Sequence, residues 1–263
     1  MYKKIALKKP IGSLGDCKDQ IAPCLILTAT VDPEDMVFTK RNDPKVRLED
    51  YKRSLTLWLN EPSVYRIVFC ENSLYDITDL IRIAEQYEEA DKRIEFLSFY
   101  GQDFPKERGK GYGELKILSH ICQRSYLFNQ SQSFIKVTGR LYVKNIQKIV
   151  AYLSKSEVDI MCKLNANLSW ADTRCFGGST AFLERYLLPL SEQIHDVEGI
   201  FLEHVLARAS HKAMSEGKKW ALPPVRPNFI GISGTDNKTY ATSWVGAFVK
   251  QRSYDLKRWV FSR

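Results

Sequence analysis

The first half of the chain alternates continuous apolar runs with segments whose apolar residues recur at helical spacing. Four runs are short, apolar and rich in β-branched or aromatic residues, the pattern of buried parallel strands. They span residues 24–31, 64–70, 94–100 and 134–137. Apolar residues three or four positions apart predict helices over residues 48–59, 76–87 and 114–124. This alternation predicts an α/β fold with a mostly parallel central sheet flanked by helices.

The second half has a weaker pattern of apolar positions. We expect helices over residues 145–153, 181–190 and 196–212, extended chain over 159–170, and a loop at Pro223, Pro224 and Pro227. No stretch has the composition of a linker, so residues 1–263 are interpreted as a single domain.

The composition indicates a basic protein and predicts the compartment in which it is found. The net charge of +8 and the pI of about 9.1 favour an anionic partner: nucleic acid, an anionic membrane surface or a phosphorylated substrate. The six cysteines include no CxxC pair, and Cys24 and Cys70 lie in apolar runs, as core residues of a protein in a reducing compartment do. We find no signal peptide or apolar span, and expect a cytoplasmic protein.

Four segments lie at the ends of the predicted strands. They are residues 28–32, 71–73, 100–102 and 138–140. Ligands of parallel sheets bind at the carboxyl ends of the strands, so these four positions are expected to form a site.

A glycine-rich segment, RGKGYGELK at residues 108–116, precedes the third predicted helix. It does not match GxxxxGK[ST], and no GxGxxG follows a strand directly. Gly109, Gly111 and Gly113 would let backbone approach a phosphate while Lys110 supplies charge. The alternative is that the glycines only allow a tight turn.

Five segments in order carry a resemblance to a known family. They are ENSLYD at residues 71–76, GKGYGE at 109–114, FIKVTGR at 134–140, FGGSTAF at 176–182 and GIFLEHVLAR at 199–208. Over residues 22–210 they resemble family 2 glycosyltransferases of the GT-A nucleotide-sugar fold. The phrases VFCENS, GKGYGE, FIKVTGRLYVKN and ADTRCF are also similar to bacterial capsule and lipopolysaccharide glycosyltransferases.

This resemblance implies a GT-A-like domain that transfers a sugar from a nucleotide-sugar donor, with a UDP-sugar favoured, to a glycan or a lipid-diphosphate-linked acceptor. Residues 22–145 would be the donor half, 146–239 the acceptor half and 240–263 an extension. The donor-binding candidates are Thr28, Glu71, Asn72, Ser73, Lys110, Gly111, Gly139 and Arg140. Arg174, Gly177 and Gly178 are the acceptor-binding candidates, and Glu203, His204 and Asp172 the catalytic ones. In this family an acidic side chain binds the nucleoside, which is the role implied for Glu71.

The sequence departs from the family where a metal is usually bound. The Asp-x-Asp segment is replaced by Thr138-Gly139-Arg140. A guanidinium can pair with diphosphate, so we expect no required cofactor, with Arg140 or Lys110 supplying positive charge. Mn²⁺ or Mg²⁺ remains an open alternative, because Asp172 could bind metal or position the acceptor. Two further alternatives are that Arg140 is a surface residue and that Asp172 pairs with Arg174.

A second departure concerns the general base. Glu203-His204 stands where the family has Glu-Asp, whose Asp deprotonates the acceptor in inverting transfer. Either side chain could accept a proton at neutral pH, and we rank the two equally. On the helical wheel His204 lies at the edge of the apolar stripe and Glu203 opposite it, so Glu203 could equally lie on a solvated face.

The extension at residues 240–263 interleaves aromatic and basic side chains. This pattern suits peripheral contact with the inner face of an anionic membrane, a lipid-diphosphate acceptor, or a helix packed on the core. It also suits single-stranded nucleic acid, but no recognition motif is present, so no nucleic-acid partner is expected. A sugar-phosphate nucleotidyltransferase is the other enzyme class considered. It would place its glycine-rich loop directly after the first strand, and would need a metal-binding acid.

Overall fold

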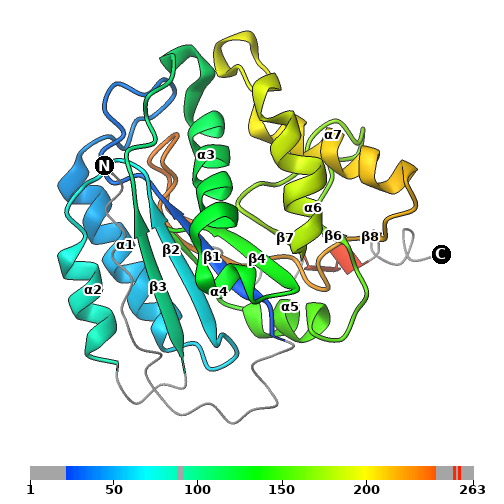
Figure 1. The fold of residues 1–263 in the computed structure, drawn as a ribbon, viewed down its shortest axis with the longest axis horizontal. Coiled ribbons are helices and arrows are strands. Elements are labelled where there is room, and N and C mark those ends of the chain that lie inside the picture. The colour runs from blue at the N-terminus through cyan, green and yellow to red at the C-terminus, as the bar shows by residue number, and fades with distance from the viewer. Residues whose placement is uncertain (1–21, 88–91, 241–250, 253, 256–263) are drawn as a thin grey trace.

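A seven-stranded sheet forms the centre of the molecule in a computed structural model, which describes residues 22–87, 92–240, 251, 252, 254 and 255 (Figure 1). Its strand order is β3-β2-β1-β4-β7-β6-β8. The strands are β1 (Cys24–Ala29), β2 (Arg66–Glu71), β3 (Arg93–Ser98), β4 (Ser133–Thr138), β6 (Ile160–Met161), β7 (Cys175–Ser179) and β8 (Trp220–Ala221). A second, two-stranded sheet pairs β5 (Leu141–Val143) with β9 (Phe229–Gly231).

The sheet is mostly parallel, which confirms the predicted α/β fold. Strands β1 to β4 pair in parallel, whereas β7 runs antiparallel to both β4 and β6. All four predicted strands of the first half are present within a few residues of their expected bounds. The continuous apolar runs arise because helices cover both faces, so every side chain of β1 and β2 is buried.

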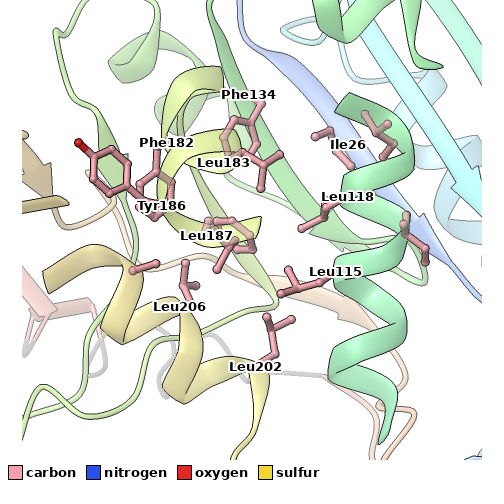
Figure 2. Packing of buried hydrophobic residues seen from close by; sticks show 14 of the residues in the cluster. Ile26, Leu115, Leu118, Phe134, Phe182, Leu183, Tyr186, Leu187, Leu202 and Leu206 are labelled. Carbon is pink, nitrogen blue, oxygen red and sulfur yellow. The ribbon is translucent and has the colours of Figure 1, made fainter. Parts of the chain in front are cut away.

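Alternate strand residues point into two separate cores. Leu27 of β1 packs with α1 (Pro44–Leu59), α2 (Thr78–Glu85) and α5 (Ile146–Leu153) on one face. Ile26 packs on the other face with α3 (Gly109–Arg124) and α7 (Leu202–Ser215). Figure 2 shows this second core, where Leu115 and Leu118 of α3 face Leu187, Leu202 and Leu206. Both halves of the chain therefore contribute to one core.

Several element predictions were wrong in the second half. Residues 181–190 form a short helix α6 (Thr180–Phe182), a π-helical turn (Leu183–Leu187) and a 3₁₀ helix (Leu188–Gln193), where Pro189 lacks the N–H that an α-helix needs. The expected helix over 196–212 breaks at Gly199, whose φ is +78°, after a 3₁₀ turn (Asp196–Glu198). Of the extended chain expected over 159–170, only β6 is a strand, and β7 was missed because its glycines lack strand propensity.

The glycine segment is part of a helix rather than a loop. Helix α3 begins at Gly109, five residues before the predicted start at Glu114, and the short helix α4 (Tyr126–Asn129) follows it. Most of residues 240–263 lies outside the described residues. Within this segment, Tyr254 is buried and its hydroxyl donates to the Pro223 carbonyl at 3.0 Å. No helix in the described part of the chain is long and apolar enough to cross a bilayer.

Candidate active site

A pocket opens where the direction of the strand order reverses. The chain runs from β1 to β2 and β3 on one side, and then returns to β4 on the other side of β1. Such a reversal leaves a crevice at the carboxyl ends of the two neighbouring strands. The cavity there has a volume of about 190 Å³, and Thr28 of β1 and Thr138 of β4 lie at its floor.

Close contact between backbones shapes this floor. The Gly139 N–H donates to the Thr28 carbonyl at 2.9 Å, and a Cβ on Gly139 would lie 2.7 Å from that oxygen. A larger residue at position 139 would therefore push β1 and the β4 turn apart. Thr28, predicted to bind donor, lines the pocket, whereas Gly139 supports it from below.

Four cationic side chains of the described residues line the pocket: Arg47, Lys110, Arg140 and Arg174. Arg140 is only 9% exposed and its Nη1 donates to the Ile232 carbonyl at 2.7 Å, so the alternative of a surface arginine is wrong. The Lys110 ammonium donates to the Thr235 hydroxyl. Ile232 and Thr235 belong to the segment after β9, which forms one wall of the pocket.

Arg174 forms the ion pair with Asp172 that was one alternative at the sequence level. Its Nε and Nη2 donate to the two Asp172 oxygens at 2.9 and 2.6 Å, and its guanidinium lies over the rings of Phe229 and Tyr240. The guanidinium holds the pKa of Asp172 below its usual value against the opposing effect of burial. Arg174 lines the pocket, but its carboxylate partner already compensates its charge.

Among the described residues, two glutamates line the pocket. Glu203, in the first turn of α7, accepts a hydrogen bond from the Thr173 hydroxyl at 2.8 Å and is half-buried. Glu114 of α3 accepts from the Thr28 hydroxyl at 2.7 Å and pairs with the fully buried Lys136 ammonium at 2.5 Å. Lys136 therefore compensates the charge of Glu114, whereas no described cationic side chain is hydrogen-bonded to Glu203.

The Asp196 carboxylate lies beside the glycines of α3, at the position where the sequence predicted that a phosphate would bind. Its carboxylate lies against the first turn of α3: a Cβ on Gly109 would be 2.0 Å from Oδ2, and one on Gly111 would be 3.5 Å from Oδ1. The pKa of Asp196 is raised to about 6, chiefly by burial and also by the charge of Glu203, against the lowering effect of Lys110 and of the first-turn amides of α3. The glycines thus admit the protein's own carboxylate to the positive end of the helix.

The donor-binding candidates at the carboxyl end of β2 divide into two groups. Glu71 is fully buried and outside the pocket wall, where it accepts hydrogen bonds from the N–H groups of Val31 and Ser73 and from the Ser73 hydroxyl. Asn72 lines the pocket, and its Oδ1 accepts from the Thr30 hydroxyl at 2.6 Å. Glu71 and Ser73 therefore fix the loop after β1, while Asn72 faces the cavity.

His204 does not line the pocket. Its Nδ1 accepts the Phe201 N–H at 3.2 Å and so caps α7, while its ring packs edge-on against Trp170. With Nδ1 used as an acceptor, the neutral ring carries its proton on Nε2 and has no free lone pair. This geometry favours Glu203 over His204 as the proton acceptor at this site.

Gly177 and Gly178, expected to bind acceptor, lie inside the sheet. In β7 they pair with Ile135 and Phe134 of β4. A Cβ on Gly177 would be 2.4 Å from the Phe134 carbonyl oxygen, and one on Gly178 would be 2.1 Å from the Asp159 carbonyl oxygen. Close strand packing accounts for both glycines.

The described residues were expected to supply no carboxylate pair for a metal ion at this pocket. No group of three or more His, Cys, Asp or Glu side chains among the described residues could hold a metal ion. At the position of the family's Asp-x-Asp segment the side chain that enters the pocket is the Arg140 guanidinium.

Sequence reasoning missed Asp196, Glu114 and Lys136. Lys136 carried a usable signal, since a lysine inside an apolar strand pattern is fully buried only when it is paired. Asp196 carried none, because its partner glycines lie more than eighty positions earlier in the sequence.

Comparison with known proteins gives only distant likenesses. The sequence matches no model of a protein family and no curated protein. Among solved structures, the chain is similar to a protein from Desulfovibrio desulfuricans G20 assigned as a nucleotide-diphospho-sugar transferase, with a TM-score of 0.44 and 10% identity over 76% of this chain and 78% of that one. A glycosyltransferase involved in glycosylation of the major capsid of PBCV-1 gives 0.38 and 10% over 76% and 82%. A cytidylyltransferase from Leptospira borgpetersenii gives 0.42 and 11% over 90% and 94%. At these scores the likenesses do not assign a function.

Proposed function

We propose that this protein is a glycosyltransferase that moves a sugar from a nucleotide-sugar donor, with a UDP-sugar favoured, to a surface glycan or a lipid-linked acceptor. One observation carries the proposal: the pocket at the strand reversal has cations beside a glutamate whose carboxylate, within the described part of the chain, is hydrogen-bonded to a hydroxyl and to no cation. Lys110 and Arg140 suit a diphosphate, and Glu203 suits an acceptor hydroxyl.

The proposed reaction is a direct displacement with inversion. Glu203 accepts the proton of the acceptor hydroxyl while the hydroxyl oxygen attacks the sugar carbon that bears the diphosphate. The bond between that carbon and the diphosphate oxygen breaks, and the electron pair leaves with the nucleoside diphosphate. Arg140 and Lys110 stabilise the growing negative charge, and we propose that the reaction needs no metal ion.

A ligand screen tests this proposal. We expect UDP, other nucleoside diphosphates or their sugars to raise the melting temperature, because a ligand at 100 times its Kd adds about 2.7 kcal/mol. The increase should persist in EDTA and fall sharply in Arg140→Ala. Arg185→Ala, on the π-helical turn outside the pocket wall, is the matched control.

Three outcomes would contradict all or part of the proposal. If no nucleotide raises the melting temperature, the proposed nucleotide-sugar donor is contradicted. If EDTA abolishes the increase, only the metal-free mechanism is contradicted. Release of pyrophosphate from a nucleoside triphosphate and a sugar phosphate would instead identify a nucleotidyltransferase.

A further inference from the structure

Three aromatic rings from distant parts of the sequence meet beside the pocket. Phe38 comes from the loop between β1 and α1, Trp170 from the loop before β7, and Phe201 from the start of α7. The centroid of the Phe201 ring lies 6.4 Å from that of Phe38 and 5.8 Å from that of Trp170, both in edge-to-face geometry. We call Phe38, Trp170 and Phe201 the aromatic platform.

Core packing does not explain the platform. The Phe38 side chain is 55% exposed, and its φ of +56° is in the left-handed region that bulky residues rarely adopt. An exposed ring held in an unfavourable backbone conformation is typical of a functional position. Phe201 is half-buried and lines the pocket, so the platform is continuous with the cavity.

The same local contacts hold the platform and Glu203 together. The Ala171 N–H, adjacent to Trp170, donates to the Glu203 carbonyl at 3.0 Å, and the Thr173 hydroxyl donates to the Glu203 carboxylate. Phe201 precedes Glu203 by two residues in the first turn of α7. His204 contacts both Trp170 and Phe201 and fixes their orientation. A ligand on the platform therefore lies next to Glu203.

We infer that the aromatic platform binds a sugar ring of the acceptor. This inference rests on the proposed function and deepens it. A pyranose has an apolar C–H face that packs on aromatic rings and a polar rim whose hydroxyls can reach a carboxylate. The three rings carry no charge, so they suit a neutral sugar better than the diphosphate, for which Lys110 and Arg140 are available. Arg174, the earlier acceptor candidate, is already paired with Asp172.

The first test measures binding without any donor. Saturation-transfer NMR is applied to the methyl glycosides of glucose, galactose, mannose, rhamnose and N-acetylglucosamine, and to maltose and dodecyl maltoside. We expect saturation at C–H protons of at least one sugar, lost in Phe38→Ala and retained in Tyr126→Ala. Tyr126 is the matched control because it is 61% exposed and lies on α4, before β4 and so at the opposite end of the sheet. Trp170→Phe, which keeps a ring, should bind nearly as wild type.

The second test measures transfer to the sugar identified by NMR. Phe38→Ala should raise the acceptor KM about tenfold, leaving the donor-induced rise in melting temperature unchanged. An equal KM in Phe38→Ala and Tyr126→Ala would overturn the inference. So would an absence of saturation at every sugar, or saturation confined to the alkyl chain of dodecyl maltoside, which would identify a lipid. Sugar binding without nucleotide binding would contradict only the proposed donor chemistry, whereas nucleotide binding without sugar binding would contradict only the platform.

Discussion

At the scale of single residues, the environment of each carboxylate decides what it can do. Glu203 accepts a hydrogen bond from the Thr173 hydroxyl, and Glu114 forms an ion pair with the buried Lys136 ammonium. The Asp196 carboxylate packs against the first turn of α3. Glu203 lies at the pocket and has no hydrogen-bonded cation among the described residues; Asp196 shares both features, but its carboxylate is packed against the glycines of α3. His204, next to Glu203 in the sequence, is engaged in capping α7 and in aromatic packing.

Replacing Glu203 should therefore affect turnover selectively. We expect Glu203→Gln to lower kcat by roughly 10²–10⁴-fold with little change in donor affinity, because the side-chain amide cannot accept the proton. Steady-state transfer to a fixed acceptor measures this. Glu198→Gln, at a 66% exposed side chain, should be silent, and a loss in His204→Gln as large as that in Glu203→Gln would contradict the assignment.

Asp196 should make stability depend on pH in a defined direction. Burial raises its pKa from 3.8 to about 6, so between these values the folded protein binds more protons than the unfolded chain. The contribution of Asp196 to the free energy of unfolding should fall as pH rises from about 4 to 6, and Asp196→Asn should remove that contribution from the slope. Above pH 6 the Asn variant should be more stable by on the order of 1 kcal/mol. Urea unfolding at several pH values checks this, and an unchanged slope in the variant would contradict it.

At the scale of elements, the start of α3 shows how a local motif acquires a different use. The glycines were expected to form a loop for a ligand, but they form the first helical turn and receive Asp196 and Leu202. Gly109 has φ +76° and no space for a Cβ, whereas Gly199 has φ +78° and no atom within 4 Å of the Cβ position. A larger residue at Gly199 would therefore introduce backbone strain alone, whereas one at Gly109 would add steric overlap to the same strain.

This pair gives a matched test of the α3 contact. Gly199→Ala should cost about 1–2 kcal/mol, the price of a left-handed alanine. Gly109→Ala should cost about 1–3 kcal/mol more, because its methyl group overlaps the Asp196 carboxylate. The midpoints of urea unfolding measure both values. Equal losses would show that Asp196 does not pack there in solution.

At the scale of the whole molecule, the two halves share one sheet and one core. Strand β4 of the first half pairs with β7 of the second, and Leu118 of α3 belongs to the same core as Leu206 of α7. Unfolding either half would expose this shared core. The division into a donor half and an acceptor half therefore stays a functional prediction.

We expect the described halves to unfold in one cooperative transition. Far-UV circular dichroism and tryptophan fluorescence should give the same urea midpoint, because Trp58 packs in one half and Trp170 and Trp220 lie in the other. Trp58→Phe and Trp170→Phe variants assign the fluorescence change to each half. Two separated midpoints would contradict a shared core.

Local sequence patterns were enough to predict the elements of the first half and the edge of the sheet at which a site would form. Buried strands and amphipathic helices leave local patterns, and residues that follow parallel strands meet at one edge whatever the details. Thr28, Asn72 and Arg140 were found in this way, and the structure places all three at the pocket. Only the tertiary structure decided which groups meet across the chain. In the folded protein Glu71 is buried beneath the loop after β1, and Asp196 packs against the start of α3. Phe38, Trp170 and Phe201 lie together as a cluster. These contacts depend on the packing of distant segments, which no local periodicity encodes.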